Sequence, residues 1–282
     1  MDSLNTNVIS DSLQVAEKSG ESDWILHHAL DANYLEFDYI FGTLTIPLPH
    51  IELFGIDLSI TKHLVYMWFA AIVLFVMLFN VAKKYKKTKV PTGFASMTEV
   101  MIVFVRDEIA KPTIYKGYEK FVPYLLSAFF FILVLNLLSL VPYGVAVTGN
   151  ISVTATLAVF TFIVTQIGGI RNNGFVGYFK GLVPHGIPVW ILPIMVVVEM
   201  LGLFTKPFAL AVRLFANMLA GKIIIYSLIG LIFILHAYFV VPVSVAFALF
   251  IFLLKLLVSI IQAYIFTMLS SLFIGMAVHQ DH

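Results

Sequence analysis

Two apolar tracts, residues 189–235 and 237–278, are far longer than the sequence needed to cross a membrane once. About 20 apolar residues carry a helix across the roughly 30 Å hydrocarbon core of a bilayer. Each tract therefore predicts either a steeply tilted helix or a broken one, and Pro242 in the "HAYFVVP" region marks the turn between them. Since 60% of all residues are hydrophobic and only 12% are charged, the sequence predicts a polytopic membrane protein.

Three shorter apolar segments precede these tracts, at residues 63–82, 121–142 and 151–170. Each is long enough to cross the bilayer as a helix with a rise of about 1.5 Å per residue. Residues 94–114 combine a helical period with mixed charge, which is typical of a helix at the membrane surface. We therefore expect an all-α polytopic membrane protein with five transmembrane segments, one cytoplasmic interfacial helix, and a long tilted hairpin formed by the last two helices.

Charge divides the chain into three parts. Residues 1–61 hold ten carboxylates and one basic residue, which predicts an acidic extramembrane segment. The alternating pattern and turn residues of "FGTLTIPLPHIELFGIDLSI", residues 41–60, favour a short hairpin there. Residues 62–120 contain the first span, a basic loop and the interfacial helix, with nine Lys/Arg between 83 and 120. Residues 121–282 form the membrane domain, with only two acids. Because Lys/Arg-rich loops stay in the cytoplasm, we expect the N-terminus outside and the C-terminus inside.

Arg213 lies in the middle of the apolar stretch "KPFALAVRLFANMLAGK". A charge at the bilayer centre costs about 2.5–3.5 kcal/mol on insertion scales, so it either snorkels to the surface or pairs with a carboxylate. Glu199 is fourteen residues away, about 20 Å along one helix, which excludes a direct pair. The arginine is therefore expected to meet a carboxylate of another chain. Small residues near its stripe would allow close approach of a partner: Gly202, Ala209, Ala216 and Ala220.

Other polar residues fall on the same faces. Asn217 lies one turn after Arg213, and Lys255, Ser259 and Gln262 stand at i, i+4 and i+7 on one face of the last helix.

Two other classes of membrane protein, secondary transporters and membrane hydrolases, fit the sequence poorly. A transporter would usually show inverted repeats and several coupling carboxylates. A hydrolase would need a motif such as H-E-x-x-H or G-x-S-x-G, and neither occurs.

The segments "KPFALAVRLFANMLAGK" and "IIQAYIFTMLSSLFIGMAV" resemble subunit a of the F-type ATP synthases, as does "LNLLSLVPYGVAVTGNISVTATLA". The resemblance covers residues 62–282. It implies a non-catalytic stator with two offset half-channels that lead protons to the carboxylates of a c-subunit ring. It further implies that proton flow drives rotation and ATP synthesis. The implied partners are the c-ring, b-type peripheral stalk subunits, other ATP synthase subunits and the lipid bilayer, with no nucleic acid, cofactor or metal.

The resemblance also assigns residues to ion translocation. Arg213 takes the place of the essential arginine that separates the two half-channels, Asn217 that of the asparagine one turn later, and Gln262 that of the glutamine in the last helix. Glu199 stands at a site of the cytoplasmic access path and Asn136 at a polar site of an earlier helix. Ser259 is a further uncharged group along the expected outer route.

Two lysines depart from the family pattern. At the positions of Lys222 and Lys255 the family commonly has an acid and a histidine, in either order. Both lysines are expected at similar depth in the outer half-channel, either as solvated cations in a wet vestibule or as buried amines that relay protons. Other histidines are possible substitutes, although each is also consistent with a surface or interfacial position: His236, His185, His27 and His28.

The cellular location follows from two features of the first residues. The start of the chain lacks the pattern of a transit peptide, and the segment that follows is acidic. Together they favour a bacterial inner membrane. Ring size and the choice between H⁺ and Na⁺ depend largely on other chains of the complex.

Overall fold

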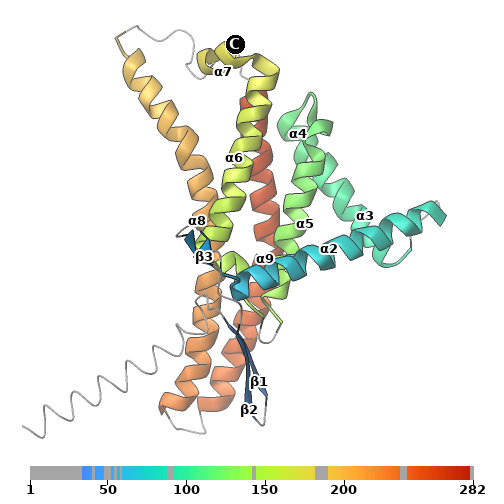
Figure 1. Cartoon of the computed structure of the whole chain (residues 1–282), viewed down its shortest axis with the longest axis vertical. Coiled ribbons are helices and arrows are strands. Elements are labelled where there is room, and N and C mark those ends of the chain that lie inside the picture. Colours follow the sequence, from blue (N-terminus) through green and yellow to red (C-terminus); the bar gives the residue numbers. More distant parts are fainter. Residues whose placement is uncertain are drawn as a thin grey trace, which may run out of the picture.

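The computed structural model describes residues 34–39, 42–47, 52–53, 56–57, 59–87, 92–141, 144–181, 190–235 and 240–279. In chain order the strands are β1 (Tyr34–Tyr39), β2 (Gly42–Pro47), β3 (Glu52–Leu53) and β4 (Ile56–Asp57). The helices are α2 (Lys62–Lys87), α3 (Phe94–Phe104), η1 (Val105–Ala110), α4 (Lys111–Ile114), η2 (Tyr118–Lys120), α5 (Val122–Leu138), η3 (Val147–Gly149), α6 (Ile151–Asn173), α7 (Phe175–Gly181), α8 (Leu192–Leu235) and α9 (Val240–Val278). The predicted all-α polytopic membrane fold is confirmed, and α9 packs against α5, α6 and α8 (Figure 1).

Two small antiparallel hairpins precede the helices. Strands β1 and β2 pair from Tyr34 opposite Pro47 to Tyr39 opposite Gly42, and β3 and β4 form a two-residue ladder. The sequence predicted a short hairpin within residues 41–60, and the two-residue β3–β4 pair lies there. The longer β1–β2 pair was not predicted, because β1 begins before this segment, at Tyr34.

Helix α2 is a long apolar helix with a largely exposed surface. Its 26 residues extend about 39 Å, enough to cross a bilayer, and the helix runs past the predicted end at residue 82 into the lysines that follow. Large apolar side chains such as Trp68 and Phe75 are exposed along it, as expected for a surface that faces lipid. It is anchored by Ala70, which packs against Leu135 of α5.

The segment from α3 through the π-helical turn η1 to α4 is one continuous helical stretch, which confirms the helix predicted over residues 94–114. One face buries Val105, Ile109 and Ile114 in the main core. Arg106 in the same segment is exposed, and its Nε lies 2.8 Å from Asp107 Oδ1. The Arg106 guanidinium lowers the pKa of the Asp107 carboxyl, because it stabilises the ionised form.

Four of the described helices are long and apolar enough to cross a membrane: α2, α6, α8 and α9. Helix α5 is a fifth apolar helix of 17 residues, shorter than the predicted segment 121–142. It ends early because the amides of Leu140 and Val141 bond to carbonyls three residues back, which tightens the last turn. Asn150 is the N-cap of helix α6, because its side chain accepts a hydrogen bond from the amide of Ser152.

Helices α8 and α9 decide between the two alternatives left by the sequence. Each apolar tract forms one unbroken helix, 44 residues in α8 and 39 in α9, and Pro207 lies inside α8 without ending it. At about 1.5 Å per residue, α8 extends roughly 66 Å, twice the hydrocarbon core, so an apolar helix of this length must be tilted. In Figure 1, α2 runs across the direction of α9. Pro242 lies in the first turn of α9, and the residues between the helices, 236–239, are outside the described part.

The main core gathers apolar side chains from α5, α8, α9 and the α3–α4 segment. Leu125 and Ile132 of α5, Leu214 of α8 and Phe266 of α9 are fully or almost fully buried. Helix α9 approaches α4 closely at Gly275, where an added Cβ atom would collide with the carbonyl oxygen of Thr113. Only glycine permits this contact, because a side chain there would collide with backbone atoms.

We predict that Gly275→Ala destabilises the protein. The added methyl group must push α4 away from α9, and such overpacking typically costs about 1–3 kcal/mol. The thermal unfolding midpoint of the detergent-solubilised protein should fall by several degrees. Gly230→Ala is the matched control, because a Cβ atom added there would meet no atom within 4 Å and alanine favours helix. Equal midpoints for the two variants would contradict the proposed contact.

Candidate functional site

Arg213 lies on the outward face of α8. A neighbouring face of the helix buries Leu210, Leu214 and Met218 against the rest of the bundle. Arg213 itself is exposed, and within the described residues no ion pair of its guanidinium is found. The small residues of this stripe are exposed as well: Ala209, Ala216 and Ala220. The structure thus presents a permanent cation on a shallow surface that is open to a partner.

A hydrogen bond joins α8 to α9 one turn beyond Arg213. The Nδ2 group of Asn217 donates to Oε1 of Gln262 over 2.9 Å. Asn217 is exposed beside Arg213, whereas Gln262 is buried between the helices. The pair therefore links the outward stripe of α8 with the polar interior of the α8–α9 packing.

Asn136 is the centre of a buried polar network. Its Oδ1 accepts a hydrogen bond from Thr148 Oγ1 at 2.7 Å, and its Nδ2 donates to the carbonyl oxygen of Ser259 at 3.4 Å. Ser259 Oγ in turn donates to the carbonyl oxygen of Lys255 at 2.8 Å. Asn136, Thr148 and Ser259 are fully buried. Because buried polar groups in an apolar surrounding need partners, this network fixes the position of α5 relative to α9.

The structure brings Lys222 and Lys255 together. Both line one cavity of about 140 Å³ with Ser139 and Tyr226, and each lysine is only 7% exposed. The Lys222 Nζ lies 5.5 Å from the centre of the Tyr226 ring, within the range of a cation–π interaction. The stem of Lys255 packs over Gly221, where an added Cβ atom would lie 3.6 Å from the Lys255 Cδ, an ordinary van der Waals distance.

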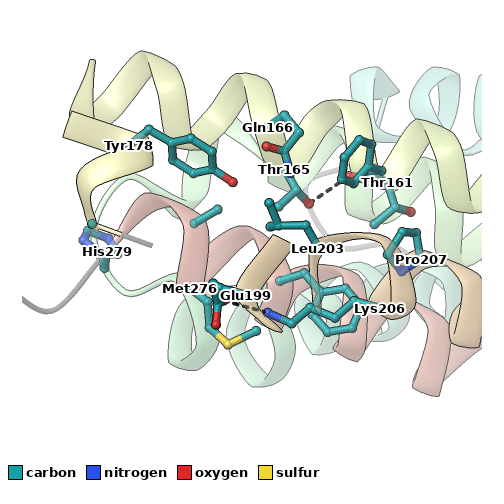
Figure 2. A pocket seen from close by; sticks show the side chains of 14 residues that line it. Thr161, Thr165, Gln166, Tyr178, Glu199, Leu203, Lys206, Pro207, Met276 and His279 are labelled. Atoms are coloured by element: carbon teal, nitrogen blue, oxygen red, sulfur yellow. Dashed lines mark hydrogen bonds and ion pairs between the residues drawn. The ribbon is translucent and has the colours of Figure 1, made fainter. Parts of the chain in front are cut away.

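Glu199 lines a second and larger cavity, of about 280 Å³, between α6, α8 and the end of α9 (Figure 2). One Glu199 Oε1 lies 4.0 Å from the Nζ of Lys206, and both side chains are about one-third exposed, 34% and 36%. Figure 2 shows Gln166 and Tyr178 on the far side of this cavity from Glu199. The Nε2 of Gln166 is buried and has no hydrogen-bond partner in the described part of the chain.

Sequence analysis missed most of this second cavity. Lys206 stands seven residues after Glu199, two helical turns away on the same face, and that spacing was a usable signal. Thr161, Thr165 and Gln166 of α6 gave no such signal, because their approach to α8 depends on how the two helices pack. The two threonines are themselves linked along α6, since Thr165 Oγ1 donates to the carbonyl oxygen of Thr161 at 2.8 Å.

Arg213 lies between the two cavities along α8. The α8 residue of the Glu199 cavity nearest to it is Pro207, six positions earlier, and that of the lysine cavity is Lys222, nine positions later. These separations correspond to about 9 Å and 14 Å along the helix axis. The cavities therefore open on opposite sides of the arginine and do not share an α8 residue.

Some predicted candidates cannot be placed. His27, His28, His185 and His236 lie outside the described residues. Within the residues that the structure does describe, no group of three or more His, Cys, Asp or Glu side chains converges as a metal site.

Comparison with known proteins gives a consistent match. Residues 64–275 match the family described as ATP synthase A chain. The chain is 55% identical to ATP synthase subunit a of Chloroherpeton thalassium over 262 residues, which cover 91% of this chain and 77% of the relative. It is 52% identical to that of Chlorobium phaeobacteroides strain BS1 over 272 residues, 94% and 79% of the two chains. For Myxococcus xanthus the identity is 53% over 234 residues, 80% and 77% of the two chains.

Proposed function

The chain belongs to the ATP synthase subunit a family, and we propose that its two cavities are offset half-channels for protons, separated by Arg213. The observation that carries this proposal is the order along α8: the Glu199 cavity, then an exposed arginine, then the Lys222–Lys255 cavity. A proton that enters one cavity cannot reach the other directly past a permanent cation. It must be carried by an acceptor that moves past Arg213.

The acceptor is a carboxylate on another chain, in the ring of c subunits. No carboxylate in the described residues pairs with Arg213, and Glu199 is instead 4.0 Å from Lys206. A guanidinium is always charged, so it stabilises an ionised carboxylate that arrives beside it. Protonation of the carboxylate from a half-channel removes this attraction and releases it. The small residues next to Arg213 let the ring helix approach closely.

Each cavity has a different role in this scheme. The Glu199 cavity serves the cytoplasmic side, where its carboxylate and neighbouring threonines receive or deliver protons. The Lys222–Lys255 cavity serves the outer side, and Ser259, Asn136 and the Asn217–Gln262 pair continue the polar route toward Arg213. Proton flow between the two sides turns the ring and is coupled to ATP synthesis. The membrane potential supplies about 2.3 kcal/mol per charge for each 100 mV.

The subunit is a non-catalytic stator that assembles with the c-ring, b-type peripheral stalk subunits and other ATP synthase subunits. We divide it into the acidic extramembrane segment 1–61, the first span with its basic loop and interfacial helix, 62–120, and the channel domain, 121–282. The basic loop is cytoplasmic by the positive-inside rule, which places the N-terminus outside a bacterial inner membrane and the C-terminus inside.

Replacement of Arg213 tests the central role of this residue. Arg213→Ala should abolish both proton-driven synthesis and ATP-driven pumping in the reconstituted complex, while the subunits still assemble. Arg213→Lys should also lose most activity, because lysine can release its proton and lacks the planar fork of arginine. Arg106→Ala is the control, since that exposed arginine pairs with Asp107 and lines neither cavity. Normal synthesis by the Arg213→Ala complex would refute the proposal.

The two lysines allow a test of the outer half-channel. If they relay protons, Lys222→Met and Lys255→Met should each slow ATP-driven pumping by about tenfold or more and shift its pH optimum. Lys111→Met, at an exposed position, should leave pumping unchanged. The double replacement Lys222→Glu/Lys255→His restores a pair that is common in the family and should support activity. Parental rates for both single variants between about pH 6 and pH 9 would exclude a relay and leave only two solvated cations.

The orientation can be tested by labelling, because the chain has no native cysteine. In inverted and right-side-out vesicles, a cysteine at position 30 should react with an impermeant maleimide only from the outer side. Lys83→Cys, in the basic stretch after the first predicted span, should react only from the cytoplasmic side. The opposite pattern would reverse the topology and exchange the two half-channels.

A further inference from the structure

A third cavity lies outside the proposed proton path. It has a volume of about 350 Å³ and is formed by the turn before α5, the start of α5 and the end of α6. Three cationic residues line it, Lys116, Lys120 and Arg171, and no acidic residue does. All three are exposed, and none of them forms an ion pair with another described residue. The cavity thus concentrates positive charge at one end of the membrane helices.

The floor of this cavity is apolar. The ring of Phe121 lies against Gly168, where a Cβ atom would come within 2.9 Å of the ring's Cζ, so a larger residue at 168 would displace the ring. Ile167 and Ile163 lie one and two turns before Arg171 on the same face of α6. Their side chains are 57% and 43% exposed. The cationic opening therefore continues into an exposed apolar stripe along α6.

We propose that this cavity binds the phosphate group of an anionic diacyl phospholipid, with an acyl chain along the Ile167–Ile163 stripe. Basic pockets between membrane helices suit lipid headgroups, because the cations neutralise the phosphate while the apolar groups contact the chains. Free phosphate would use the three cations but would leave the apolar stripe without a role. The cationic cavity suits the phosphate headgroup, and the adjoining Ile167–Ile163 stripe suits an acyl chain.

The lipid and the c-ring would not compete for the same surface. No residue of α8 lines this cavity, whereas Arg213 and its neighbouring small residues all belong to α8. A lipid in this position would contact both the α5 start and the α6 end. Near this point, in the described part of the chain, Tyr124 and Thr161 share a hydrogen bond. The lipid would hold these two helix ends together.

The test uses the complete ATP synthase complex in nanodiscs that contain a photoactivatable phosphatidylglycerol or a photoactivatable phosphatidylcholine. Labelled peptides are identified by mass spectrometry. We expect phosphatidylglycerol, and not phosphatidylcholine, to label residues 116–124 and 163–172. Each membrane-proximal cation contributes about 1 kcal/mol, so Lys116→Gln/Lys120→Gln/Arg171→Gln should reduce labelling by about a hundredfold. The single variant Lys120→Gln, expected to lose about fivefold, serves if the triple variant does not assemble.

The matched control removes the same charge elsewhere. Lys83→Gln/Lys84→Gln/Lys111→Gln changes three exposed lysines that do not line the cavity, and labelling should persist. An equal loss in both triple variants would show that only general surface charge attracts the lipid and would overturn the proposal. Unchanged labelling in the cavity variants would overturn it as well. Competition by millimolar inorganic phosphate would show a free-phosphate site instead of a lipid site.

Discussion

The antiparallel packing of α8 against α9 determines where almost every candidate site residue lies. It buries one face of α8 through Leu214 and Met218 and thereby turns Arg213 outward. The same packing brings Asn217 within 2.9 Å of Gln262 and places Lys222 and Lys255 in one cavity. A rotation of either helix by one residue, about 100°, would separate these pairs, and a rotation of α8 would also change which way Arg213 faces.

Polar groups in this bundle are arranged according to the cost of leaving them without partners in an apolar medium. Asn136, Thr148 and Ser259 satisfy one another and the backbone, and they join α5 to α9. Ser271 of α9 and Thr113 of α4 also share a hydrogen bond, close to the tight contact at Gly275. In lipid the hydrophobic effect does not drive helices together, because the surrounding acyl chains are as apolar as the side chains. Interhelical hydrogen bonds such as these therefore contribute to the association of the helices.

The Lys222–Lys255 cavity holds the two residues that depart from the pattern expected from the resemblance. Two cations enclosed by the same cavity repel each other strongly unless water or a neighbour compensates, since the interaction at 4 Å is about 4 kcal/mol at an effective dielectric of 20. The aromatic ring of Tyr226 beside Lys222 provides one such compensation. Among the described residues, no carboxylate lines this cavity.

The sequence by itself determined the membrane fold and the approximate spans, because hydropathy, helix length and charge are local properties. It also placed Glu199, Asn217, Gln262 and the two lysines on definite helix faces, since helical spacing alone sets a face. Only the tertiary structure showed that α8 and α9 are unbroken, that α5 stops at Leu138, and that α6 completes the Glu199 cavity. Contacts between helices depend on packing over distant residues, and no local pattern encodes which neighbour meets which face.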